Sequence, residues 1–167
     1  MPDQAVITVE RLIESSPTVR AFALLLRAQA VTTRRLSASL QSDHGLTIND
    51  YEALLVLSGA PDQRLMRVEL ARRLLLTPSG VTRLLEGLER AGLVERTTCE
   101  TDRRVAYAQL TDRGRETLAA ASGGHVSSID ELFEEYLSQE EVEQLGQILA
   151  KLPGVAYADD ACAALEE

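Results

Sequence analysis

Apolar residues recur at helical spacing along most of this 167-residue chain. The apolar spacing predicts a long helix from Val19 to about Ser42, because side chains three, four and seven residues apart share one helix face. Pro17, just before this stretch, is a plausible first helical residue. The apolar stripe of the long helix consists of Val19, Phe22, Leu26, Leu36 and Leu40. Thr47 and Asp50 have the spacing of a capping box, which predicts a second helix to about Ser58.

Two shorter helices with a tight turn between them follow. The first is predicted over 67–75, and four of its residues are expected to face inward: Val68, Leu70, Ala71 and Leu74. Thr77 is a good N-cap and Pro78 a good first residue for the second helix, which ends at Ala91 before Gly92. The apolar stripe of this helix consists of Val81, Leu84, Leu85 and Leu88.

The hydrophobic period then changes from that of a helix to two. Residues 93–98 and 105–110 alternate as strands do, and the charged segment 99–104 lies between them. These two strands therefore predict a β-hairpin with a charged tip.

The last third of the chain returns to helical spacing. Thr111 caps a helix that is expected to kink or break at Gly123-Gly124, because each glycine costs about 1 kcal/mol relative to alanine. The helix resumes to about Leu137, and the capping box that begins at Ser138 opens a final helix to Lys151.

The net charge of −9 argues at first against nucleic acid, but the charge is unevenly distributed. Residues 64–115 carry 11 Arg and 7 acidic residues, whereas the remainder carries 6 basic and 19 acidic residues. A basic middle segment between acidic ends is typical of a DNA-binding protein with a separate oligomerisation region. A mixed-charge solvated face would explain the charge alone equally well.

Neither a secretory signal nor an apolar run long enough for a membrane span is evident, which predicts a cytoplasmic protein without a membrane partner. Cys99 and Cys162 lie far apart and cannot build a zinc site by themselves. We expect no cofactor, no metal site and no enzymatic activity, because the chain has no nucleophile set, no phosphate-binding glycine loop and no paired catalytic carboxylates. The acidic residues of 130–143 are interpreted as a solvated helix face.

A short helix, a tight turn and a capped helix form the unit that indicates function. A second helix that enters the major groove needs a small, polar N-terminal end, and five residues meet this need: Thr77, Ser79, Gly80, Thr82 and Arg83. Arg83 is the best candidate for contact with a base edge. Arg90 is expected to touch phosphate or an acidic neighbour.

The tip of the hairpin points to the same function. An Arg on a loop can enter the narrow minor groove of A·T-rich DNA, and Asp102 can hold such an Arg extended. A helical hairpin that does not bind nucleic acid would explain the leucines, but not Arg103 and Arg104 beside an Asp.

At these residues the sequence resembles the MarR family of winged helix-turn-helix regulators. Residues 102–111, DRRVAYAQLT, match the D-x-R-x5-L-T signature of the family without a gap, and residues 69–96 resemble its helix-turn-helix and the entry to its wing. The resemblance is dense from about Leu65 to Gly114 and looser from Pro17 to Leu152.

This resemblance implies a mainly α fold with a small β wing, in which N- and C-terminal helices form a homodimer. It implies that residues 78–91 enter the major groove, that Arg104 enters the minor groove with Asp102 orienting it, and that Arg103 contacts phosphate. The operator would be pseudopalindromic double-stranded DNA. The predicted division is an arm over 1–16, a helical dimerisation region over 17–45 and 112–152, a DNA-binding domain over 46–111 and a tail over 153–167.

The function expected from the resemblance is that of a repressor released by a small aromatic or phenolic ligand. Tyr51 and His44 are the candidate ligand-binding residues, although a core tyrosine and a satisfied loop histidine explain them as well; His125 is interpreted as another satisfied loop histidine. Three alternatives remain: a winged-helix protein-interaction module, a redox regulator that acts through Cys99, and a DNA-binding regulator without a ligand.

Overall fold

The computed structural model describes residues 16–98 and 106–155. In chain order the elements are α2 (Pro17–His44), α3 (Ile48–Ser58), the 3-10 turn η1 (Pro61–Gln63), β1 (Arg64–Met66), α4 (Arg67–Arg73), α5 (Pro78–Arg90), β2 (Val94–Thr98), β3 (Ala106–Leu110), α6 (Asp112–Glu134) and α7 (Gln139–Leu149). The mainly helical chain with a small sheet confirms the expected fold class. No helix in these two ranges is long and apolar enough to cross a membrane.

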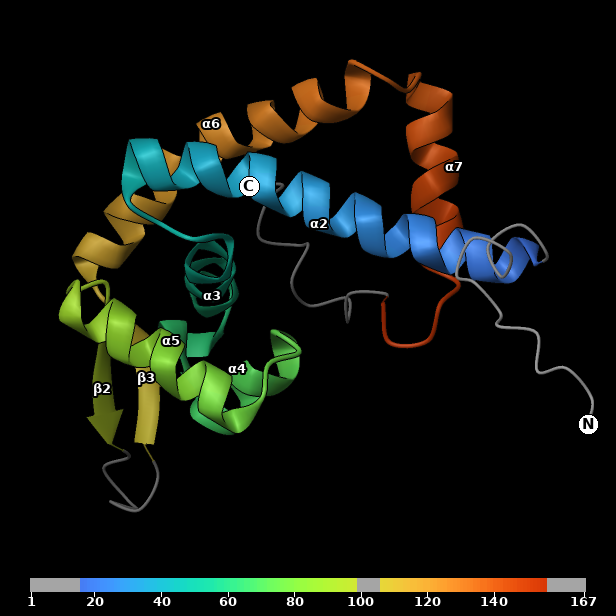
Figure 1. The fold of residues 1–167 in the computed structure, drawn as a ribbon. Coiled ribbons are helices and arrows are strands. Elements are labelled where there is room, and N and C mark those ends of the chain that lie inside the picture. Colours follow the sequence, from blue (N-terminus) through green and yellow to red (C-terminus); the bar gives the residue numbers. More distant parts are fainter. Residues whose placement is uncertain (1–15, 99–105, 156–167) are drawn as a thin grey trace, which may run out of the picture.

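The helices form two tiers around α3 (Figure 1). Helices α2 and α6 pack side by side over one side of α3, while α4, α5 and the strands lie on its other side (Figure 1). Helix α7 lies at the end of α6 that is remote from the sheet (Figure 1). This arrangement sets α5 and the hairpin apart from the long helices α2 and α6.

The sheet has three antiparallel strands in the order β1-β3-β2, one more than the sequence predicted. Leu65 of β1 and Arg96 of β2 both pair with Ala108 of the central strand. The additional strand has only three residues, too few to show an alternating pattern, and it exists because β3 offers it a pairing edge.

The core is built almost entirely from leucine, valine and alanine. The largest fully buried side chains are Leu40, Leu54, Leu57, Leu70, Leu88, Val81 and Val94. The prediction that Val68 faces inward is wrong, because this side chain is 80% exposed. Residues two positions apart on a helix differ by about 200° in direction, so Val68 faces solvent once Leu70 is buried.

Of the kink or break expected at Gly123-Gly124, the break does not occur, because α6 continues through both glycines as one helix. Ala121 and His125 on either side are buried, so packing holds this part of the helix in place. The glycine carbonyls also accept hydrogen bonds from the hydroxyls of Ser127 and Ser128. Tertiary packing outweighs the low helix propensity of glycine here.

Candidate nucleic-acid interface

Local hydrogen bonds define where α5 begins. The Oγ1 atom of Thr77 accepts a hydrogen bond of 3.1 Å from the Gly80 amide, and Pro78 occupies the first turn, where no amide hydrogen is needed. The chain leaves the helix through Gly92, whose φ of +71° favours glycine. These three features confirm the helix bounds expected from the sequence to within one residue.

One face of α5 is buried and the opposite face is open. Val81, Leu85 and Leu88 pack into the core. The side chains on the outward face are Ser79, Arg83, Glu86 and Arg90, which follow one another at steps of four, three and four residues. The helix therefore presents a continuous polar stripe with an arginine at its middle and another at its C-terminal end.

The small polar residues at the start of α5 have structural tasks as well. Ser79 is exposed, and its hydroxyl lies 3.2 Å from that of Thr77. The hydroxyl of Thr82 donates a 2.8 Å hydrogen bond to the Pro78 carbonyl one turn earlier. A Cβ atom on Gly80 would lie 3.2 Å from the Thr77 Oγ1 atom, so a side chain at this position would press on the cap.

The two arginines of the stripe differ in how they are held. Arg90 is exposed, and its Nε atom donates a 3.0 Å hydrogen bond to the Glu86 carbonyl of its own helix. Arg83 is exposed and makes no hydrogen bond or ion pair with the residues that the structure describes. A ligand that binds its guanidinium therefore displaces no contact with the described part of the chain.

The strands β2 and β3 lead away from the C-terminal end of α5 toward the hairpin tip (Figure 1). Thr98 and Ala106 form the last described pair of this hairpin. Cys99 and the predicted wing residues Asp102, Arg103 and Arg104 lie outside the described residues.

The base of the hairpin is joined to α6 through a contact that the sequence analysis missed. The Thr111 hydroxyl donates to the Gly92 carbonyl at 2.8 Å and accepts from the Gly114 amide at 3.0 Å. A Cβ atom on Gly114 would overlap the Leu93 carbonyl and lie 2.7 Å from Leu110 Cδ1. Only glycine allows α6 to approach the strands this closely.

A charged cluster on α4 was also missed. The Glu69 carboxylate accepts hydrogen bonds from the guanidinium groups of Arg72 and Arg73, and these bonds lower the pKa of Glu69 to about 2. The spacing of three and four residues could have revealed this cluster from the sequence. It fixes two arginines on the helix that precedes α5.

No hydrogen bond within the described ranges joins the two candidate ligand-binding residues, His44 and Tyr51. His44 is the last residue of α2 and is half-buried. Tyr51 is buried in α3, donates a 3.3 Å hydrogen bond to the Ser122 hydroxyl, and packs edge-on against the His125 ring at a centroid distance of 4.5 Å. The interpretation of His125 as a satisfied loop residue is wrong, because it lies buried within α6 and its Nδ1 atom has no hydrogen-bond partner in the described ranges.

Comparison with known proteins agrees with this geometry. The sequence profile of the MarR family matches residues 44–105. The HTH-type transcriptional regulator MhqR of Bacillus subtilis is 30% identical over 135 residues, which span 81% of this chain and 90% of that protein. The repressor YetL of Bacillus subtilis is 35% identical over 65% of this chain and 66% of its own length.

A solved structure shows the same similarity in three dimensions. Sco3205, a MarR family transcriptional regulator from Streptomyces coelicolor determined in complex with DNA, is 28% identical and superposes with a TM-score of 0.72. The match covers 89% of this chain and 88% of that chain. The capped helix, the hairpin and these similarities agree, and the chain belongs to the MarR family of transcriptional regulators, which are not enzymes.

Proposed function

We propose that this chain is a homodimeric repressor that reads a pseudopalindromic operator with α5 and the wing. The observation that carries the proposal is the outward stripe of α5, where exposed Ser79 and Arg83 follow a capped helix start. Amides at a helix start attract phosphate, and arginine can form a bidentate contact with guanine. The relative solved with DNA and the relative named as a repressor support both parts of this proposal.

The proposed contacts divide into those that select sequence and those that position the protein. Arg83 contacts a base edge, with Ser79 beside it, and Arg90 contacts phosphate. In the wing, Arg104 enters the minor groove and Arg103 contacts phosphate. Asp102 keeps Arg104 extended through a charge-assisted hydrogen bond.

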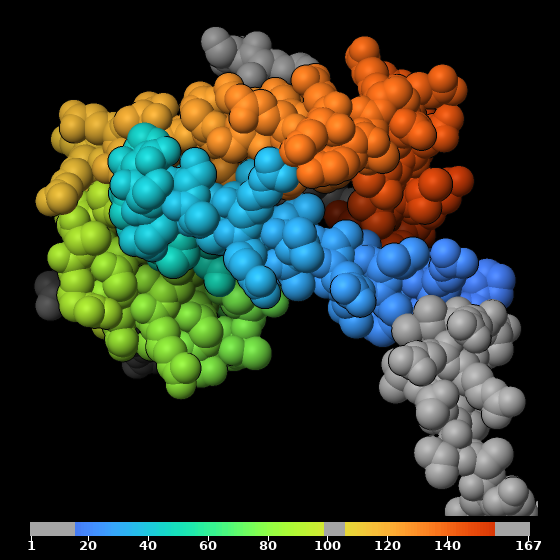
Figure 2. Space-filling model, turned by 45° about the horizontal axis from the view of Figure 1, so that its top comes forward, coloured from blue at the N-terminus to red at the C-terminus, as the bar shows by residue number. Residues whose placement is uncertain are grey.

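Dimerisation is supported by apolar side chains that a single chain leaves uncovered on α2. Phe22, Leu24 and Val31 are each more than half exposed, and the N-terminal end of α2 projects past α7 (Figure 2). An apolar surface of this kind marks a protein interface. A second copy of the chain is the proposed partner.

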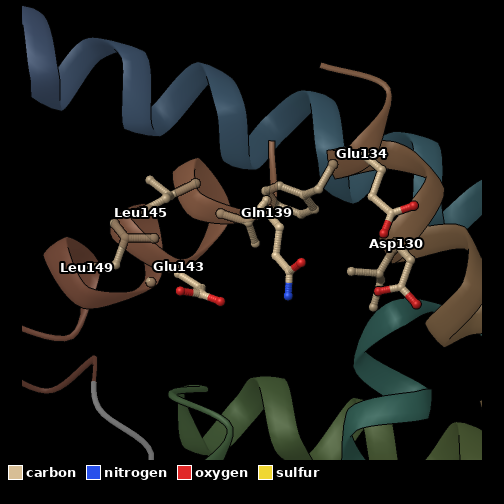
Figure 3. Close-up of a pocket in the computed structure, with 10 residues that line it drawn as sticks. Asp130, Glu134, Gln139, Glu143, Leu145 and Leu149 are labelled. Atoms are coloured by element: carbon tan, nitrogen blue, oxygen red, sulfur yellow. The ribbon is translucent and has the colours of Figure 1, made fainter. Parts of the chain in front are cut away.

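A hollow between α6 and α7 supplies a matching surface. It has a volume of about 570 Å³ and an apolar floor that includes Phe133, Leu145 and Leu149. Figure 3 shows the carboxylates of Asp130 and Glu134 on one side of the hollow and α7 on the other. Because α2 carries Arg at positions 20, 27 and 34, its charge is complementary to this acidic rim.

The proposed effector is a small aromatic or phenolic compound that releases the DNA. Tyr51 is proposed as the first contact, where α3 meets α6; a ligand that bonds to its hydroxyl would replace the hydrogen bond to Ser122. His44 is proposed as a second contact at the end of α2. Thermal shifts with a panel of such compounds, in the presence and absence of operator DNA, test this part of the proposal.

The first experiment compares wild type, Arg83→Ala and Arg90→Ala on a duplex taken from upstream of the protein's own gene. Loss of the Arg83 contact should cost about 1–3 kcal/mol and relax selectivity at one base pair of each half-site. Loss of Arg90 should weaken binding to all sequences alike and reduce the salt slope by about 1. Binding is measured by fluorescence anisotropy over a salt series.

The same series includes Arg104→Ala, which should also lose about 1–3 kcal/mol if the wing reads the minor groove. Weak and unselective binding that none of the three variants changes would contradict the proposal. It would instead indicate a winged-helix module that binds an acidic protein.

A further inference from the structure

His125 is a buried polar residue that DNA recognition does not use. Its side chain is 8% exposed, and the Nδ1 atom has no hydrogen-bond partner among the described residues. The ring packs edge-on against Tyr51 of α3 at a centroid distance of 4.5 Å. His125 therefore lies directly in the contact between α6 and the helix that supports the DNA-binding elements.

Among the described residues, none of the charged groups on α2 and α3 forms an ion pair with the His125 ring. Tyr51 is the titratable group that α3 places against the ring. From α2, which also packs on α6, Arg35 pairs with Glu135 at 3.0 Å and Asp43 bonds to a serine hydroxyl of its own helix. No acidic side chain in the described ranges forms an ion pair with the ring, so a proton on His125 would have no compensating charge.

We propose that His125 makes the contact between α3 and α6 sensitive to acid, so that protonation of its ring loosens this contact and weakens DNA binding. The readout on DNA rests on the function proposed above. A protonated Nδ1 atom that is buried without an acceptor is costly, and this atom gains hydration when α6 separates from α3. Helix α6 also lines the hollow assigned above to the proposed dimer interface, so its separation from α3 would change the spacing of the two recognition helices.

The direction of the effect follows from the burial of the ring. Desolvation lowers the pKa of His125 below its ordinary value of 6.5. The closed contact thus binds the proton less readily than the open one. The contact between α3 and α6 is therefore most stable above the ordinary histidine pKa, and its stability declines as the pH falls through the lowered pKa of His125.

The experiment uses the fact that the chain has only two histidines, His44 and His125. Proton NMR of the imidazole rings is recorded from pH 8 to pH 5, with His44→Gln assigning the signals. Thermal midpoints and affinity for the own-promoter duplex are measured over the same range for wild type, His44→Gln and His125→Phe. His125→Gln serves as a second variant if the phenylalanine does not fit.

Another group on α3 requires a control. Desolvation raises the pKa of Glu52, which could add its own pH dependence, and Glu52→Gln removes it. With His125 present, acid should reduce DNA affinity. The reduction is up to about tenfold for each unit by which the pKa of His125 differs between the closed and open states of the contact. Proteins without His125 should lose this component, whereas His44→Gln and Glu52→Gln should keep it.

An unchanged acid response in both His125 variants would overturn the proposal, as would titration of His125 at an ordinary pKa. Failure of every duplex to bind at neutral pH would refute the proposed function instead. The ring titration and the thermal midpoints require no DNA, so they still decide whether the contact is acid-sensitive.

Discussion

Single atoms decide how closely α6 approaches the wing. At Gly114 the helix lies against the Leu93 carbonyl, and the Thr111 hydroxyl joins the two through hydrogen bonds to both sides. A larger residue at this position would have to displace the Leu93 carbonyl at the base of the hairpin. Since the wing is proposed to reach the minor groove, a change at Gly114 should disturb both folding and binding.

Gly114→Ala should lower the free energy of unfolding by about 1–3 kcal/mol, because the added methyl group overlaps backbone and the Leu110 side chain. The matched control is Gly124→Ala in the same helix, where a Cβ atom has nothing within 4 Å. That control should stabilise the protein by roughly 0.5–1 kcal/mol. Urea denaturation of the three proteins measures both effects, and equal stabilities would contradict the close contact.

Whole elements begin and end where local hydrogen bonds dictate. Helix α7 opens with a capping box, in which the Ser138 hydroxyl caps the Glu141 amide and the Glu141 carboxylate accepts from the Ser138 amide. The hydrogen bond from the Ser138 amide is the main cause of the lowered pKa of Glu141. The ionised Glu141 carboxylate contributes to the stability of α7 in full above its ordinary pKa of 4.5. This contribution is lost as the pH falls through the lowered pKa of Glu141 in the folded protein.

Ser138→Ala should cost about 1 kcal/mol of local stability in α7, because the amides of its first turn lose their cap. Native-state hydrogen exchange of α7 amides measures this loss. The same variant should also show a weaker response to acid below the ordinary Glu141 pKa of 4.5, because it loses the side-chain hydrogen bond that helps to lower this pKa. Ser128→Ala, which removes a mid-helix hydroxyl bonded to the Gly124 carbonyl, should leave α7 exchange unchanged, and an equal effect of both variants would argue against the cap.

At the scale of the whole molecule, the exposed apolar side chains of α2 and the hollow between α6 and α7 are two apolar surfaces that the described part of a single chain leaves open. The sheet and α5 lie at the other end of the molecule (Figure 1). A second copy could therefore cover α2 and α7 without hiding the polar stripe of α5.

Phe22→Asp should dissociate the proposed dimer, because it places a charge on the 60% exposed apolar side chain of α2. Val68→Asp is the matched control, because Val68 is 80% exposed but lies on α4. Sedimentation velocity should show monomers for the first variant and dimers for wild type and the second. Dissociation by Val68→Asp alone would move the interface to α4.

The amino-acid sequence by itself determined the features that depend on neighbours within one or two turns. The caps at Thr47, Thr77, Thr111 and Ser138 were predicted correctly because a cap needs only residues three positions apart. The buried face of α5 followed from helical periodicity in the same way. The wing signature at 102–111 also indicated the family, which the comparisons confirm.

Tertiary structure alone decided the features that depend on partners distant in the chain. The strand β1 forms because β3 pairs with it, and α6 continues through Gly123-Gly124 because its flanking residues are buried. Val68 faces solvent because the core accepts Leu70 on the opposite side of α4. The burial of His125 against Tyr51 arises from the packing of α6 on α3, a contact between residues more than 70 positions apart that no local pattern encodes.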